Sequence, residues 1–195
     1  MVMVEAQVKF AIVGHPKRAS MAYNLTKTLA GVLFMDTPGE GAYANHRRAL
    51  AWAARQGERV TIVEDDALPV TGVDALTDEW AARHPDDLLS FYLGTGHPTQ
   101  WMRQVDARWG DHDEYVQLPK LIHGVAYSVP PGHVQGVLDR MGPGPIDYAV
   151  GDAWRALTGG NVIYPKASLF DHRDGDSLAS TGTRRTRRTA RLLHT

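Results

Sequence analysis

Residues 60–70 read VTIVEDDALPV, a stretch that decides how the rest of the chain is interpreted. An apolar, β-branched run typical of a buried strand passes directly into three carboxylates, Glu64, Asp65 and Asp66. Three adjacent negative charges repel one another, so they cost stability unless a proton or a counter-cation intervenes. Mg²⁺ and Mn²⁺ prefer oxygen ligands and often bridge protein carboxylates to substrate phosphates. The stretch predicts a strand that ends in a divalent-cation site, with an acidic surface turn as the alternative.

Outward from this strand, apolar runs alternate with helical patterns. Strands are expected at residues 8–14, 32–35, 59–63, 88–94, 121–129 and 162–164. Helices are expected around Leu25 and Leu29 and at residues 42–56, 131–141 and 146–157. Gly57 and Gly159 stand where C-terminal helix caps belong. This alternation predicts an α/β sandwich with a mostly parallel central sheet, in which ligands bind at the carboxyl ends of the strands.

The composition limits the class of protein. A chain of 195 residues suits a single domain that can bury a core without disulfide bonds. It has no cysteine, which excludes disulfide bonds, thiolate metal ligands and cysteine nucleophiles. No apolar run approaches the length of a membrane span, and the N-terminus lacks the pattern of a secretory signal. We therefore expect a cytoplasmic protein with no membrane partner.

Charge is distributed unevenly along the chain. The net charge is −1, but five of the 21 basic residues are arginines close to the C-terminus, which leaves 16 basic against 22 acidic residues elsewhere. These arginines are Arg184, Arg185, Arg187, Arg188 and Arg191. The pattern predicts a folded domain over residues 1–180 and a basic, flexible tail over residues 181–195. The tail could screen the phosphates of a nucleic acid, or it could be a solvated terminus.

A turn near the N-terminus is the second candidate for a binding site. Residues Gly14 to Arg18 (GHPKR) end the first expected strand and lead into a helix. Backbone amides at the start of a helix attract anions, and the side chain of Arg18 adds positive charge. The turn, which includes His15 and Pro16, therefore suits a diphosphate or the polar edge of a nucleotide. An ordinary connection between a strand and a helix is the alternative.

A histidine follows the last expected strand. His172 stands beside Asp171 and Asp174 in the stretch SLFDHRDGDSL, residues 168–178. A neutral imidazole could complete a metal site begun by Asp66, although a lone histidine in a polar loop is more often solvated.

Two further carboxylates, Asp147 and Asp152, flank a helical turn in PIDYAVGDAW, residues 145–154. A carboxylate held beside an acceptor hydroxyl can act as a general base. Side chains five residues apart do not share a helical face, so at most one of the two should point into a site. Capping of the helix is the alternative role for Asp147.

Taken together in their order along the chain, these four sequence segments resemble those of GT-A type glycosyltransferases. The resemblance is greatest to small bacterial and phage enzymes similar to the lipopolysaccharide and collagen glycosyltransferase family. The resemblance rests on residues 39–70 (GEGAYANHRRALAWAARQGERVTIVEDDALPV), where Gly41, His46 and Trp52 precede the acidic triplet. Further segments that resemble the family are HGVAYSVPPGHVQGVL, PIDYAVGD and KASLFDHRDGDSL. The likeness spans roughly residues 8–180, with only the pattern matching over 71–120. The family's D-x-D metal motif is E-D-D here, which makes the last carboxylate the expected metal ligand.

The resemblance implies a Rossmann-like, nucleotide-sugar-binding sandwich that transfers a hexosyl or pentosyl group from a donor such as a UDP-sugar to a hydroxyl group, with inversion. Asp66 and His172 would hold Mn²⁺ or Mg²⁺ against the donor's diphosphate. Asp147 or Asp152 would deprotonate the acceptor. The remaining donor-site residues would be His15, Pro16, Arg18, Asp36, His46, Glu64 and Asp65.

The acceptor and two other functions stay open. A hydroxymethylated pyrimidine in DNA, bound through the basic tail in a phage-infected or bacterial cell, is one expected acceptor, and a protein or a saccharide is the other. A metal-dependent nucleotidyltransferase could use the same acidic site, but it would release pyrophosphate. A noncatalytic nucleic-acid-binding protein would rely on the tail and would leave the acidic triplet unexplained.

Overall fold

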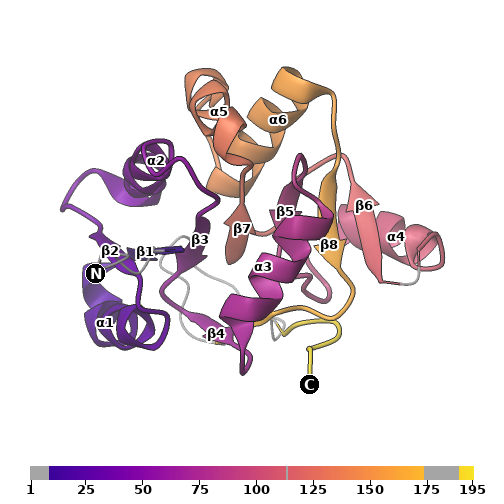
Figure 1. Cartoon of the computed structure of the whole chain (residues 1–195), viewed down its shortest axis with the longest axis horizontal. Helices are drawn as coiled ribbons and strands as arrows, with labels where there is room; N and C mark the ends of the chain where they lie inside the picture. The colour runs from indigo at the N-terminus through magenta and orange to yellow at the C-terminus, as the bar shows by residue number, and fades with distance from the viewer. Residues whose placement is uncertain (1–8, 113, 174–188) are drawn as a thin grey trace, which may run out of the picture.

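The protein is an α/β sandwich in a computed structural model that describes residues 9–112, 114–173 and 189–195 (Figure 1). The central sheet contains β1 (Phe10–Gly14), β2 (Val32–Met35), β3 (Thr61–Glu64), β5 (Leu88–Ser90), β6 (Tyr115–Leu118), β7 (Ala126–Ser128) and β8 (Val162–Pro165). A separate pair is formed by β4 (Ala67–Pro69) and β9 (Phe170–His172). The helices are α1 (Ala19–Thr28), α2 (Gly41–Ala53), α3 (Val73–Arg83), α4 (Thr99–Arg108), α5 (Val134–Arg140) and α6 (Ile146–Thr158), with 3₁₀ turns η1 (Pro16–Arg18) and η2 (Pro131–His133).

The seven strands of the central sheet follow the order β2-β1-β3-β7-β5-β8-β6. Strands β1, β2 and β3 pair in parallel, as do β5 and β8. Strand β7 lies antiparallel between β3 and β5, and β6 lies antiparallel on the edge beside β8. Five strands therefore point one way and two the other. The predicted α/β sandwich is confirmed. Its central sheet is mixed, because β7 and β6 run antiparallel to the other five strands.

Alternating side chains along the strands supply a core on each face of the sheet. In β1, Ala11 and Val13 join the core beneath α2, α5 and α6, whereas Phe10 and Ile12 join the core shared with α1 and α3. This two-residue alternation puts apolar side chains on both faces of the strand, so both layers of helices remove apolar surface from water. None of the described helices is long and apolar enough to span a membrane.

Local sequence signals located several elements closely. The second expected strand coincides with β2, and Gly159 ends α6 with a positive φ of 72°, as the cap position predicted. Two expected strands are shorter than predicted, because β5 ends at Ser90 and β7 begins only at Ala126. Beyond Ser90 the backbone leaves the sheet: Leu93 accepts a hydrogen bond from the N–H of Arg191. Helices α3 and α4 and strands β4, β6 and β9 were not predicted.

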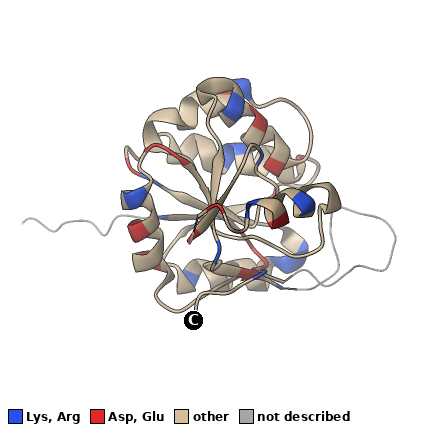
Figure 2. Ribbon diagram, turned by 90° about the vertical axis from the view of Figure 1, so that its right-hand side faces the viewer, with Lys and Arg blue, Asp and Glu red and all other residues tan. Residues whose placement is uncertain are grey.

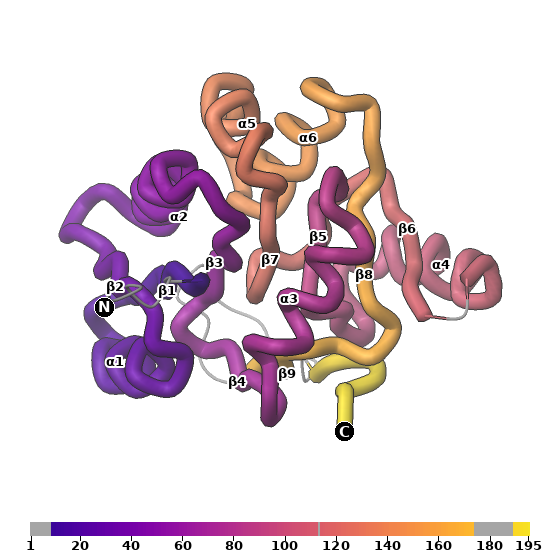
Figure 3. The backbone as a smooth tube through the Cα atoms, in the orientation of Figure 1, coloured from indigo at the N-terminus to yellow at the C-terminus, as the bar shows by residue number. Residues whose placement is uncertain are grey.

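Of the expected tail, the structure describes residues 189–195, and these pack against the body (Figure 3). The N–H of Ser168 donates to the carbonyl of Leu192, and His194 donates back to Ser168. Arg191 forms an ion pair with Asp106. Backbone groups of residues 189–195 therefore find partners on neighbouring segments, which differs from the flexible end expected there. The other four tail arginines lie outside the described residues.

Candidate active site

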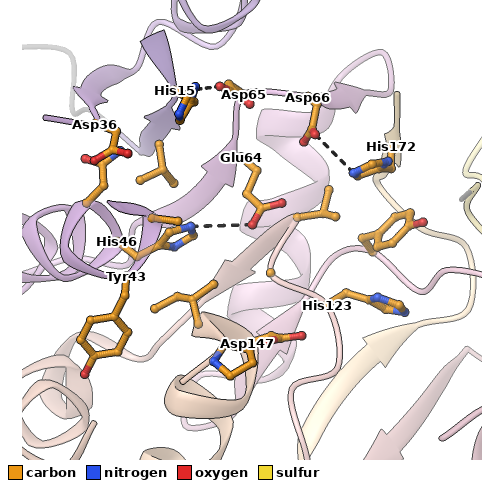
Figure 4. Close-up of a pocket in the computed structure, with 18 of the residues that line it drawn as sticks. His15, Asp36, Tyr43, His46, Glu64, Asp65, Asp66, His123, Asp147 and His172 are labelled. Carbon is orange, nitrogen blue, oxygen red and sulfur yellow. Dashed lines mark hydrogen bonds and ion pairs between the residues drawn. The ribbon is translucent and has the colours of Figure 1, made fainter. Parts of the chain in front are cut away.

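A pocket of about 670 Å³ opens where β1, β2 and β3 end (Figure 4). Gly14, Asp36 and Glu64, which lie at or just after the ends of these three strands, all line it. The opposite wall comes from the segment before β7 and from the first turn of α6. The pocket therefore lies where ligands are expected in a sheet of this class.

Two of the three acidic residues meet a histidine at this pocket. Potential ligand atoms of Glu64, Asp66 and His172 all lie within 4.8 Å of one another, and His172 Nε2 is 3.4 Å from Asp66 Oδ2. The pairing of β4 with β9 produces this arrangement, because it sets Ala67 opposite His172. The structure thus brings together the two expected metal ligands, Asp66 and His172. It adds Glu64, which the sequence analysis had placed among the donor-binding residues.

The middle carboxylate has different partners. Asp65 is buried, with 1 % of its side chain exposed, and accepts a 2.7 Å hydrogen bond from the N–H of His15. Its other oxygen lies 2.8 Å from Nη2 of Arg18. Asp65 therefore fixes the turn after β1 against the end of β3, which positions His15 and Arg18 at the edge of the pocket.

Burial and neighbouring charges separate the pKa values of the three carboxyl groups. Burial, together with the charge of Asp66, raises the pKa of Glu64 to about 8. Burial also raises the pKa of Asp65. For Asp66, burial acts upward, but the hydrogen bond and charge of His172, with Arg18, outweigh it and lower the pKa. At neutral pH, Glu64 consequently carries a proton in the absence of a cation, while Asp66 is ionised.

A buried histidine and a glycine shape the surroundings of Glu64. His46 lies with Nε2 3.7 Å from Glu64 Oε1 and with Nδ1 3.2 Å from the hydroxyl of Tyr127. Burial lowers the pKa of His46 to about 4, so its imidazole is neutral at pH 7. A Cβ atom at Gly124 would lie 3.0 Å from Glu64 Oε1. The glycine therefore leaves the space that the carboxyl group occupies.

The structure separates the two candidate bases. Asp147 lies in the first turn of α6 and lines the pocket. Asp152 is exposed, is not among the lining residues and forms an ion pair with Lys120. Asp152 therefore lies outside the pocket, because five helical positions turn it away, which agrees with the expectation that at most one of the two carboxylates points into a site. Pro16, expected at the donor site, is also exposed and is not among the residues that line the pocket.

Several residues that line the pocket carried no recognised sequence signal. Asn45 is buried in α2, and its side-chain amide donates to the carbonyls of Gly14 and Phe34, which joins the ends of β1 and β2. An asparagine among the alanines of an expected helix is the sequence signal that could have revealed it. The other residues missed are Tyr43, His97 and His123.

Comparisons with known proteins identify the fold alone. No family model matches the sequence, and no curated protein is significantly similar to it. The chain is similar in structure to A197 from STIV, solved by crystallography, with a TM-score of 0.56 over 86% of this chain and 87% of that one. Sequence identity over this match is 9%, so the similarity concerns the arrangement of helices and strands.

Proposed function

We propose that this protein is a metal-dependent glycosyltransferase of the GT-A kind, which transfers a sugar from a nucleotide-diphosphate sugar to an acceptor hydroxyl. The observation that carries the proposal is the cluster of Glu64, Asp66 and His172 on one wall of the pocket, with the carboxylate of Asp147 on another (Figure 4). The volume of about 670 Å³ lies in the range of small-molecule and cofactor sites.

The ligand set suits Mn²⁺ or Mg²⁺. Two carboxyl groups and an imidazole supply hard oxygen ligands and one nitrogen. Asp66 Oδ1 is buried and has no hydrogen-bond partner among the described residues, which leaves an anionic oxygen to be satisfied. A bound divalent cation would offset the negative charge that develops on the leaving diphosphate.

The chain's own residues would place the two substrates. Asp36, at the end of β2, has a buried Oδ1 with no hydrogen-bond partner among the described residues, and it would accept a hydrogen bond from the nucleoside. Asp147 would take the proton from the acceptor hydroxyl. The acceptor oxygen then bonds to the anomeric carbon as the bond to the diphosphate oxygen breaks, which inverts that carbon.

The acceptor is proposed as a class, a hydroxyl group on DNA, protein or saccharide. Basic and acidic residues are interspersed along the helices that Figure 2 shows. Arg191 is paired with Asp106 and stacks on Trp109, with its Cζ 4.5 Å from the ring centre. DNA as the acceptor therefore rests on Arg184, Arg185, Arg187 and Arg188. Changing these four to alanine should lower transfer to DNA at low salt and leave donor binding unchanged.

A panel of nucleotide sugars, measured by thermal unfolding with and without Mn²⁺, tests the donor. One donor should raise the unfolding temperature in Mn²⁺ and have little effect in EDTA. Release of a nucleoside diphosphate supports sugar transfer, whereas release of pyrophosphate identifies a nucleotidyltransferase. Asp66→Asn keeps the shape of the side chain without its charge, so Mn²⁺-dependent stabilisation should disappear. Asp139→Asn, at an exposed position on α5, is the matched control.

A further inference from the structure

Arg18 occupies the position beside the carboxylates where the proposed site requires a cation. Its Nη2 lies 2.8 Å from Asp65 Oδ1, and its Nη1 is hydrogen-bonded to Asp66 Oδ2. The same Oδ2 atom is the one nearest to His172 Nε2. A divalent cation at either oxygen of the Asp66 carboxylate, the unpaired Oδ1 included, would lie close to the guanidinium charge, and like charges repel. Arg18 and a cation therefore compete for Asp66.

The arginine is also placed to contact a ligand. It lines the pocket, 25% of its side chain is exposed, and its Nε is buried without a hydrogen-bond partner among the described residues. A guanidinium presents paired N–H donors that match phosphate oxygens. Rotation about the bonds of a long side chain can move these donors several ångströms without moving the backbone of η1. Arg18 can thus exchange one anionic partner for another within the same pocket.

We propose that Arg18 is an exchangeable counter-charge, which neutralises Asp65 and Asp66 in the free protein and moves to the donor's diphosphate when a divalent cation binds at Asp66. The inference rests on the proposed function, since it needs both a cation and a diphosphate. A cation alone would leave the guanidinium beside a like charge, and a diphosphate alone would meet the carboxylates. With both ligands present, each charge has an opposite partner. Cation and diphosphate binding are therefore coupled through Arg18.

Binding constants measured separately for the two ligands test this coupling. Mn²⁺ affinity is read by electron paramagnetic resonance and UDP affinity by calorimetry, each with and without the other ligand. In the wild type, UDP should tighten Mn²⁺ binding by about tenfold or more. In Arg18→Met, Mn²⁺ alone should bind about fivefold more tightly, and UDP at saturating Mn²⁺ should bind at least about tenfold more weakly. Lys27→Met, an exposed lysine on α1, is the control for lost charge and should match the wild type.

A second variant keeps the test decisive if Arg18→Met unfolds. In the double variant Arg18→Met, Asp65→Asn, one of the two buried carboxylates that lose Arg18 is made neutral. The new amide still accepts the hydrogen bond from the N–H of His15, and Asp66 remains for the cation. The double variant should show the same tighter Mn²⁺ binding and weaker coupling. Wild-type coupling that survives unchanged in both variants overturns the inference alone. Wild-type protein that binds neither Mn²⁺ nor UDP overturns the proposed function, and the inference with it.

Discussion

Single residues at the pocket are of two kinds: those whose side chains line the cavity and those that hold other residues in place. Asp147 belongs to the first group by its position at the start of α6, and Asp65 belongs to the second through its hydrogen bond from His15. Sequence reasoning named Asp147 as a candidate base and Asp65 as a donor-site residue, but it left Asp147 and Asp152 as alternatives, because paired aspartates look alike until the backbone directs them. Glu64 and Asp66 also differ in protonation, since burial raises the pKa of Glu64 while His172 and Arg18 keep Asp66 ionised.

Asp147→Asn tests the proposed base. The amide cannot accept a proton, so turnover should fall by about 10²–10⁴-fold while donor affinity stays within about twofold of the wild type. Steady-state kinetics and calorimetry separate the two effects. Asp152→Asn is the control on the same helix, because that exposed side chain faces Lys120 outside the pocket. Equal losses in the two variants would remove Asp147 from the chemistry.

His46 should make the stability of the fold depend on pH. Its folded pKa of about 4 lies below the ordinary value of 6.5, so the folded state favours the neutral ring. The stability that follows from this is present above pH 6.5 and is lost as the pH falls towards 4, by about 3 kcal/mol in total. In urea unfolding, His46→Gln should be less stable than the wild type at pH 7, and the gap should narrow by this amount at pH 4. A gap that stays constant between the two pH values would contradict the prediction.

At the scale of elements, one arginine joins a loop to the sheet. Arg59 donates to the carbonyls of His84, Pro85 and Asp87 in the loop before β5 and to that of Ser128 in β7. Burial lowers its pKa to about 10, with the charges of Asp86 and Asp87 opposing the change, so it stays charged at neutral pH. The charged guanidinium group of Arg59, largely removed from water, therefore holds the loop against the sheet.

Arg59→Met should destabilise the fold by about 2–4 kcal/mol, because four carbonyl groups lose a charged donor. The free energy of unfolding in urea measures the effect. Arg55→Met, at an exposed position after α2, should change it by less than about 0.5 kcal/mol. A similar value for both variants would mean that solvent replaces the lost donors at no cost.

Several elements with a local signal were predicted well, although helices α3 and α4 were missed, and the short strands that depend on distant partners were not predicted. The apolar run of β2 and the glycine after α6 are readable within a few residues. Strands β4 and β9 have only three residues each and exist because they pair across about a hundred positions of chain. No periodicity within either segment predicts that pairing. Glu64 and His172 therefore share a site for a reason that local patterns do not contain.

On the scale of the whole molecule, the C-terminal segment completes the structure around the site. Residues 189–195 contact the segment after β5 at Leu93 and the turn at Ser168, and Ala190 donates its N–H to Asp171, the neighbour of His172. The segment thus supports the stretch of chain that carries the proposed histidine ligand.

Deleting residues 189–195 should lower the unfolding temperature by about 5 °C, since several backbone hydrogen bonds and the pairing of Arg191 with Asp106 are lost. Mn²⁺ affinity should fall as well, because β9 loses support on one side. Differential scanning calorimetry and a Mn²⁺ titration measure the two effects. An unchanged unfolding temperature would show that the segment contributes nothing to the fold.

The pairing of β4 with β9 also has a consequence for biosynthesis. The ribosome makes the chain from its N-terminus, so Glu64 and Asp66 leave it long before His172. A nascent chain can assemble β1, β2 and β3 while its acidic cluster still lacks the imidazole. The proposed metal centre would therefore mature only after the ribosome has passed His172, and a translation product interrupted before that residue would have the first three strands of the pocket without the complete set of proposed metal ligands.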